Sequence, residues 1–280
     1  QNMRPFARFL LLASCLTLTF NTFAKEPLRV GLSPDYPPLV YKDRGQLTGI
    51  DVAAAEVLGQ QLGRKTEFVE KSFNQLIPAL QAGEIDIIMS GMTITPERSE
   101  KVSFSQPYLS AGQMAIIRFA DAGRFGFKGA MFRPGARVAV LKNTTSEDFA
   151  AKSLKNASVT HCNSTNEAFA LLKGGQVDFL LHDAATSWSL ATDKSKQDLM
   201  SLNTELTDEH LGWAVKKDNA VLLQAVNQQL TIMQKNGMLR AIISKWIPVT
   251  VEVTDAAPAA IPANLPKTPA ANIQNSNGNK

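Results

Sequence analysis

Arg98 is a candidate ligand for a bound anion because of its position in the sequence. Thr95 is a natural helix N-cap and Pro96 fits the first helical position, so Arg98 falls in the first turn of a short helix. The helix dipole favours acidic residues there, whereas the forked guanidinium suits bidentate contact with a carboxylate. A surface ion pair with Glu97 or Glu100 explains the arginine equally well, so both interpretations stay open on this local pattern.

Three further groups could complete a site for an α-amino acid. Gly91 and Thr93, just before Arg98, would present backbone N–H groups to the same anion. Thr145 lies at the hydroxyl-rich start of another helix, which is also a favourable place for an anion. Asp183 directly follows an apolar strand and is a good acceptor for an ammonium group, although it could also cap the next helix.

Tyr36 and Phe73 would supply apolar walls. Tyr36 lies in the loop 33–38, which two consecutive prolines stiffen. In parallel α/β sheets such loops meet at the carboxyl ends of strands, beside helix N-termini, where ligands bind. Together with the carboxylate and ammonium partners above, the two aromatic rings describe a clamp for an α-amino acid.

Two α/β halves are predicted to position these residues. Strands and helices alternate in the first half at 28–32, 50–62, 67–69, 74–82 and 85–89. The same order recurs at 137–141, 145–154, 158–161, 166–173 and 177–181. Residues 79–90 also match 171–182 position by position, which favours an internal repeat of a parallel sheet wrapped by helices. A chance likeness between two helix–glycine–strand passages is the alternative.

The chain after the second half is too short for a third domain. A strand at 211–215 and helices at 219–235 and 238–246 are expected to return to the first lobe, so that two strands form a hinge. The predicted organisation is a signal peptide at 3–24, lobe 1 at 25–112, lobe 2 at 113–209, a return to lobe 1 at 210–250, and a disordered Ala/Pro/Asn-rich tail at 251–280.

The N-terminus resembles an export signal. Met3 to Ala24 combines two basic residues, a short apolar stretch and small residues before the expected cleavage site after Ala24. A lipobox ending at Cys15 is the alternative, and it would make that cysteine a lipid anchor. Cleavage after Ala24 leaves only Cys162, so no intramolecular disulfide is expected.

Composition excludes some classes of protein. With 280 residues, of which 44% are hydrophobic, the chain has room for two domains of ordinary size. Its formal net charge is +4, and it falls to about +2 without Arg4 and Arg8 in the expected signal peptide. So small a charge, evenly spread, does not indicate a nucleic-acid partner. No metal-ligand spacing and no nucleophile–base set is present, so no metal, cofactor or catalytic residue is predicted.

Several spaced motifs, in order, resemble the family 3 extracellular solute-binding proteins, the amino-acid-binding subunits of bacterial ABC importers. The resemblance covers residues 27 to about 248 and is carried by segments 36–38, 49–52, 85–98, 104–108, 236–237 and 245–246. It implies a periplasmic-binding-protein-like (type II) α/β fold, a Venus flytrap in which a two-strand hinge joins two lobes. It further implies a periplasmic protein, expected to be a monomer, that delivers its solute to the membrane permease of an ABC importer.

The resemblance assigns ligand-binding roles to eight residues: Arg98, Gly91, Thr145, Ser90, Thr93, Asp183, Tyr36 and Phe73. The first three would hold the ligand α-carboxylate, with Gly91 and Thr145 acting through their backbones. The next three would hold the α-ammonium, and the last two would sandwich the side chain. Basic-ligand binders of the family carry an acidic residue where Ser33 stands here, which argues against a strongly cationic ligand unless Asp35 or Asp51 substitutes.

Two other functions fit the same fold. Some periplasmic relatives resemble cyclohexadienyl dehydratases, and an acid for that chemistry would come from Asp183, Glu205, Asp208 or Glu209, with His182 or His210 assisting. A sensory binding protein that works without a transporter is the second alternative. The prediction is binding rather than catalysis, and the pattern leaves the side chain of the ligand open.

Overall fold

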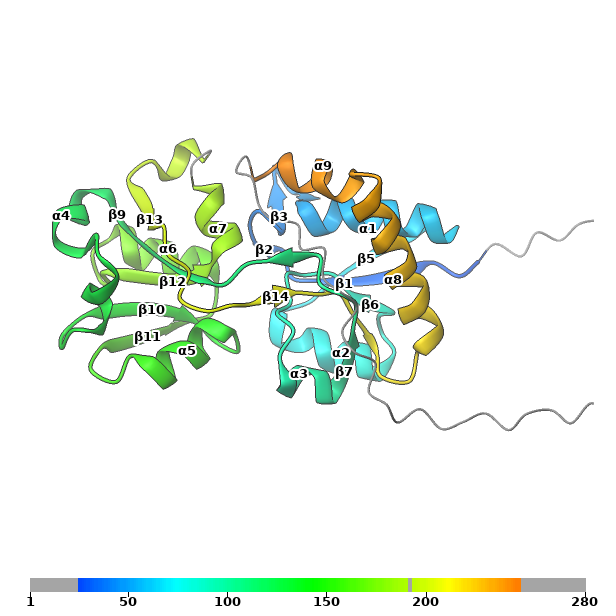
Figure 1. Ribbon diagram of the computed structural model, residues 1–280, viewed down its shortest axis with the longest axis horizontal. Helices are drawn as coiled ribbons and strands as arrows, with labels where there is room; N and C mark the ends of the chain where they lie inside the picture. Colours follow the sequence, from blue (N-terminus) through cyan, green and yellow to red (C-terminus); the bar gives the residue numbers. More distant parts are fainter. Residues whose placement is uncertain (1–24, 191–192, 248–280) are drawn as a thin grey trace, which may run out of the picture.

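Two α/β lobes lie side by side in the computed structural model, which describes residues 25–190 and 193–247 (Figure 1). Two crossing strands, β8 (Leu109–Ser110) and β14 (His210–Leu211), pair antiparallel where the chain passes between the lobes. This is the predicted bilobal arrangement with a two-strand hinge. The predicted signal peptide, the alternative at Cys15 and the tail from residue 251 lie outside the described residues.

Lobe 1 is built on a mixed sheet of five strands. Their spatial order is β5 (Thr66–Glu70), β1 (Leu28–Leu32), β6 (Ile87–Ile88), β15 (Ala214–Lys216) and β7 (Val102–Phe104). The helices of this lobe are α1 (Ile50–Leu62), α2 (Leu76–Ala82), α3 (Pro96–Lys101), α8 (Ala220–Lys235) and α9 (Met238–Ser244). Because β15, α8 and α9 belong to this lobe, the chain returns to it after lobe 2, and α8 and α9 pack on α1 (Figure 1).

Lobe 2 repeats the plan with its own five-stranded sheet. The order is β11 (Ser158–Cys162), β10 (Arg137–Leu141), β12 (Phe179–Asp183), β9 (Gln113–Arg118) and β13 (Leu199–Leu202). Its helices are α4 (Ala122–Phe125), α5 (Thr145–Ser153), α6 (Thr165–Lys173) and α7 (Ala184–Ser189). Short 3-10 turns complete the two lobes at Phe73–Gln75, Phe119–Asp121, Lys128–Phe132 and Lys194–Lys196.

The two sheets are mixed, with parallel strands from the predicted repeats and antiparallel strands added beside them. The strands of the two predicted repeats pair in parallel, but β15 runs antiparallel to β6 and β7, and β9 runs antiparallel to β12 and β13. The predicted strand at 211–215 is also two elements, since Leu211 pairs in the crossing whereas Ala214 pairs in the sheet of lobe 1. Both differences arise where the chain enters a lobe from the hinge.

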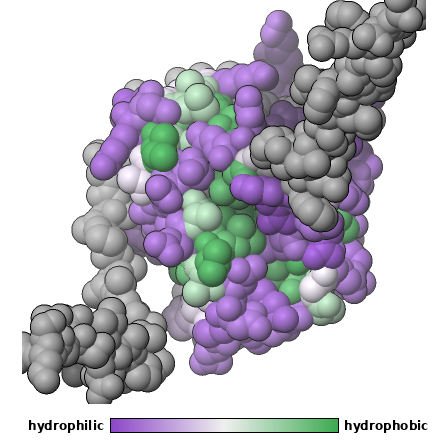
Figure 2. All heavy atoms as spheres, turned by 90° about the vertical axis from the view of Figure 1, so that its right-hand side faces the viewer, coloured by the Kyte–Doolittle hydropathy of each residue, from purple (hydrophilic) through white to green (hydrophobic). Residues whose placement is uncertain are grey.

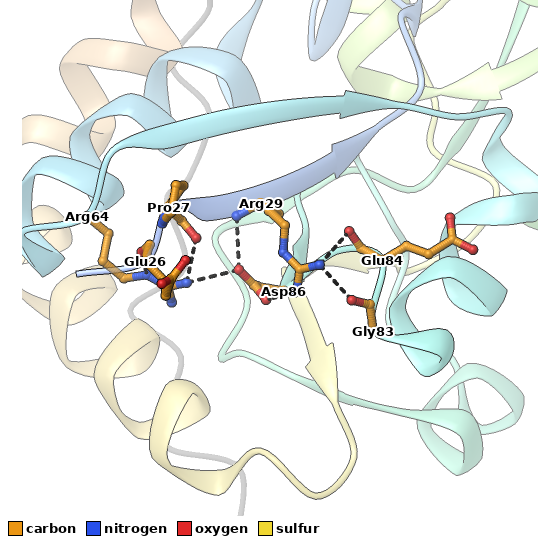
Figure 3. Close-up of polar contacts among 7 residues, drawn as sticks. All are labelled: Glu26, Pro27, Arg29, Arg64, Gly83, Glu84 and Asp86. Carbon is orange, nitrogen blue, oxygen red and sulfur yellow. Dashed lines mark hydrogen bonds and ion pairs between the residues drawn. The ribbon is translucent and has the colours of Figure 1, made fainter. Parts of the chain in front are cut away.

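The repeat between the lobes extends to single hydrogen bonds. In lobe 1 the Asp86 N–H donates to the Arg29 carbonyl at 2.8 Å, and the Arg29 guanidinium donates to the Asp86 carboxylate at 2.6 Å (Figure 3). In lobe 2 the Asp178 N–H donates to the Arg137 carbonyl at 2.8 Å, and the Arg137 guanidinium donates back at 2.5 Å. The same arginine–aspartate pair therefore joins the first and third strands of each repeat, which is too specific for a chance likeness.

A small antiparallel sheet sits beside the cleft side of lobe 1. Its strands are β2 (Asp35–Tyr36), β3 (Val40–Asp43) and β4 (Gln46–Thr48). The segment 33–38, expected to be a loop, therefore contains a short strand, because Asp35 and Tyr36 pair with Tyr41 and Val40. This pairing fixes the direction of the Tyr36 side chain.

The end of lobe 1 that lies away from lobe 2 is mainly hydrophilic. Figure 2 shows a band of apolar surface there, bordered by polar side chains. No helix in the described ranges is both long enough and apolar enough to cross a membrane. The predicted ligand-binding residues lie elsewhere, between the lobes.

Candidate functional site

A cavity of about 390 Å³ lies between the two lobes, a volume ordinary for a small-molecule site. Side chains from both lobes line it, and among them are seven of the residues predicted to bind a ligand: Tyr36, Phe73, Gly91, Thr93, Arg98, Thr145 and Asp183. Residues far apart in the sequence are thus brought to one cavity. Their individual contacts decide what each can offer a solute.

Arg98 is half-buried and forms no ion pair among the described residues. Thr95 caps its helix, with its hydroxyl accepting from the Arg98 N–H at 3.2 Å. The guanidinium donates to the Thr93 carbonyl at 3.0 Å and to the Asn143 carbonyl of lobe 2 at 3.3 Å. Burial lowers the pKa of Arg98, while the charges of Asp183 and other acids oppose the shift. A half-buried guanidinium whose hydrogen-bond partners are both carbonyls is well placed to receive a carboxylate.

The alternative explanation for Arg98, a surface ion pair with a neighbouring glutamate, is wrong. Glu97 instead pairs with Lys101 at 2.8 Å, one helical turn along. The Arg98 guanidinium lies 5.4 Å from the centre of the Phe73 ring, within reach of a cation–π contact. Phe73 therefore orients the arginine as well as lining the cavity.

Asp183 is the last residue of β12, and its side chain points into the cavity rather than capping α7. The carboxylate accepts hydrogen bonds from the Tyr36 hydroxyl, across the cleft, and from the Gln113 amide on the neighbouring strand. The pKa of Asp183 is raised to about 7, chiefly by burial and also by the charge of Glu209, whereas the hydrogen bonds from Tyr36 and Gln113 oppose the shift. A cationic group beside this carboxylate would stabilise its ionised form.

Tyr36 is held by groups from the opposite lobe. Besides its hydrogen bond to Asp183, its ring centre lies 5.0 Å from that of His182. The ring also packs against Gly91, whose backbone has a positive φ of 59° and leaves no room for a Cβ atom. The two aromatic walls predicted from sequence therefore each have a polar partner in the cavity.

Two of the predicted contacts are not available as expected. The Gly91 N–H donates to the buried Asp51 carboxylate at 2.6 Å, so it is not free for an anion. Ser90 does not line the cavity, because its hydroxyl is buried behind the first loop and accepts from the Ser33 N–H at 2.9 Å. Asp51 itself is structural, since it also binds Tyr108 and Trp213.

Glu209, on the second crossing segment, gathers threonine hydroxyls from both lobes. Its carboxylate accepts from Thr93 of lobe 1 at 3.1 Å and from Thr145 of lobe 2 at 2.7 Å, and also from Thr207 at 2.7 Å. A hydroxyl has one proton to donate, so these threonine side chains can only accept from a bound solute. Only the backbone N–H of Thr145 therefore remains as a donor to a bound carboxylate.

Several cavity residues were not predicted to bind a ligand: Asp35, Lys71, Gln113, Lys142, Asn163, Thr165 and His182. Gln113 reaches Asp183 because β9 pairs antiparallel with β12, a pairing that no local pattern indicates. His182 could have been found from its place next to Asp183 at the end of an apolar strand. Asp35 could have been found from the loop that carries Tyr36.

A family model matches residues 28–249 of the chain. The family is described as bacterial extracellular solute-binding proteins, family 3. The chain is 29% identical over 249 residues to the ABC transporter arginine-binding protein 1 of Escherichia coli, which covers 86% of this chain and 99% of that protein. It is 33% identical over 214 residues to the ABC transporter glutamine-binding protein GlnH of Bacillus subtilis, covering 72% of this chain and 74% of that protein.

A solved structure extends the likeness to the fold. The crystal structure of the ancestral amino-acid-binding protein AncCDT-1, described as a precursor of cyclohexadienyl dehydratase, superposes with a TM-score of 0.72 at 38% sequence identity. The match covers 79% of this chain and 95% of that one. Similarity in sequence and in fold therefore extends across both lobes.

Proposed function

This chain belongs to the bacterial extracellular solute-binding proteins of family 3, and we propose that it binds a free α-amino acid in the cavity between its lobes. Arg98, from lobe 1, holds the α-carboxylate through its guanidinium, with the Thr145 backbone N–H as a second donor. Asp183, from lobe 2, holds the α-ammonium, and the Thr93 hydroxyl is a further acceptor for it. Tyr36 and Phe73 enclose the aliphatic part of the solute.

One observation carries this proposal. A cationic group without an acidic partner and a carboxylate whose pKa burial raises to about 7 line the same cavity from opposite lobes. An amino acid supplies the charge that each of them lacks, and burying both ends together offsets the cost of taking either charge out of water. A solute with only one of these charges would leave the other group unpaired.

The proposed role is binding, not catalysis. The described relatives are named as binding proteins, and the structural neighbour is described as an amino-acid-binding precursor of a dehydratase. Glu209, one of the candidate acids, does not line the cavity and is engaged by three threonine hydroxyls. Incubation with prephenate or arogenate tests the alternative, and formation of a dehydrated product would contradict the proposed role.

The proposed partner is the membrane permease of an ABC importer, which a monomeric, exported form of this chain would meet in the periplasm. Relatives of this chain are named as ABC transporter components, and the family is described as extracellular. A sensory role without a transporter is tested by reconstituting the permease encoded nearest to this chain: solute-dependent stimulation of its ATP hydrolysis is expected. Failure to stimulate any importer would favour the sensory role.

Thermal unfolding with a panel of the twenty amino acids tests the proposed function itself. Any ligand that binds only the folded state raises the melting temperature by mass action. At least one α-amino acid should raise it, whereas the same compound without its amino group or without its carboxylate should not. No shift with any amino acid would contradict the proposal.

A further inference from the structure

The cavity holds polar groups that a clamp for α-carboxylate and α-ammonium does not use. Among them are one buried imidazole, two lysine side chains and one carboxylate: His182, Lys71, Lys142 and Asp35. The part of the solute that occupies the rest of the cavity must form hydrogen bonds or ion pairs with these groups, or leave their existing contacts intact. Their existing partners show which of them are available.

His182 presents a neutral N–H donor. Only 4% of the residue is exposed, and burial lowers the pKa of its imidazole to about 3, so the ring is uncharged at neutral pH. Its Nδ1 accepts the Asp183 N–H at 2.8 Å, which leaves the ring proton on Nε2. The nearest partner of Nε2 is the Thr165 hydroxyl at 3.4 Å, a long and weak hydrogen bond. The Nε2–H is therefore available to a better acceptor.

The two lysines differ in their partners. Lys71 is paired with Glu84 at 2.5 Å, so its charge is compensated within lobe 1. Lys142 donates to the neutral side-chain oxygen of Asn163 at 2.9 Å and has no ion pair within the described ranges. Lys142 thus brings an uncompensated positive charge to the cavity.

Asp35 is already engaged. Its carboxylate accepts the Thr165 N–H at 2.8 Å, at the start of α6, where the helix dipole also favours a negative charge. Of the described cavity residues, only Asp35 and Asp183 are acidic, and Asp183 is assigned to the ammonium. A second cationic group on the solute would therefore have to compete with the N-terminus of α6 for the Asp35 carboxylate.

We infer that the side chain of the solute ends in an oxygen acceptor, an amide or a carboxylate, and carries no positive charge. His182 and Lys142 are the residues that receive it. The inference rests on the proposed function, since it takes the amino-acid head group as already bound by Arg98 and Asp183. It separates this chain from a binder of cationic amino acids, although its relatives include named binders of arginine as well as glutamine.

Calorimetry with protein freed of bound solute tests the inference. Glutamine or glutamate should bind at least tenfold more tightly than arginine, lysine or leucine. A preference for glutamine assigns the acceptor as an amide, and a preference for glutamate assigns it as a carboxylate. Tightest binding of arginine, lysine or leucine would overturn the inference and leave the proposed function standing, whereas no binding of any amino acid would overturn the proposed function.

Two variants test the assigned residues. Lys142→Met, at an exposed position that should tolerate the change, and His182→Leu should each weaken binding of the tightest ligand by about fivefold or more. Lys155→Met is the matched control, because that lysine is exposed in the same lobe but does not line the cavity. It should change the affinity less than twofold. Unchanged affinity in both Lys142→Met and His182→Leu would overturn the assignment.

Discussion

Asp35, in lobe 1, accepts a hydrogen bond from the Thr165 backbone N–H, in lobe 2, at 2.8 Å. The contact places a carboxylate from one lobe at the N-terminus of α6 in the other lobe. Because the contact joins the two lobes, opening of the cleft would break it, and we expect it to favour a closed arrangement. Contacts within the protein therefore join the two lobes at the cleft.

We expect Asp35→Ala to weaken solute binding. Loss of a carboxylate at a helix N-terminus costs about 1 kcal/mol, which corresponds to roughly a fivefold lower affinity when only the closed state binds tightly. Isothermal titration calorimetry measures the change, with Asp43→Ala, at the exposed end of β3 in lobe 1, as the control. An Asp35→Ala affinity equal to that of the control would contradict a role in closure.

Arg98→Ala should abolish measurable binding while the protein stays folded. Removing one partner of a buried charge pair costs roughly 2–5 kcal/mol of affinity. Arg240→Ala, on the exposed face of α9, is a matched control that should bind normally. Calorimetry reports the affinity and circular dichroism the fold. Near-normal affinity in Arg98→Ala would remove this arginine from the site.

Solute affinity should depend on pH through Asp183. Burial raises the pKa of the empty site's carboxylate to about 7, and an ammonium group binds only the ionised form. Affinity should therefore fall as the pH drops below about 7, by up to tenfold per pH unit. Asp183→Asn should bind more weakly at every pH and lose this dependence. It should also discriminate less against des-amino analogues. A wild-type affinity that is flat from pH 5 to 8 would contradict this role.

Asp51→Asn should lower the free energy of unfolding by roughly 1–3 kcal/mol. The NH₂ group of the asparagine would face hydrogen-bond donors that the Asp51 carboxylate now accepts from. These are the Gly91 N–H, the Tyr108 hydroxyl and the Trp213 indole, at 2.6, 2.9 and 3.1 Å.

Burial raises the pKa of Asp51 to about 6, so between about pH 4 and 6 the folded state binds more protons than the unfolded state. The Asp51 contribution to the free energy of unfolding therefore falls as the pH rises through this window, and Asp51→Asn should flatten that slope. Urea unfolding from pH 4 to 7 measures both effects, with Asp43→Asn as the control. A slope identical to that of the wild type would contradict the shift.

Local sequence patterns predicted helices, and residues that line the cavity, where the physical cause is itself local. The helix 50–62 appears with its predicted bounds, since its apolar spacing and the glycine after it suffice. Arg98 could be predicted because capping by Thr95 fixes its place in a first turn. The internal repeat was also visible, and the matched pairs Arg29–Asp86 and Arg137–Asp178 give its structural basis.

Which hydrogen-bond partner each site residue takes could not be predicted from the sequence. Whether the Gly91 N–H is free depends on Asp51, forty positions away, and whether Ser90 faces the cavity depends on the loop at Ser33. Gln113 reaches Asp183 only through an antiparallel pairing set by the path of the hinge. Such contacts are decided by tertiary packing, so residue type and spacing carry no sign of them.

Closure of the lobes on the solute would show directly that the solute binds between them. An empty closed site buries Arg98 without a carboxylate and holds Asp183 with a raised pKa, so the free protein should open despite the Asp35 contact. Small-angle X-ray scattering compares protein freed of solute with the same sample at saturating amino acid. The radius of gyration should be smaller with the ligand. An unchanged radius, with binding confirmed by calorimetry on that sample, would contradict a site between the lobes.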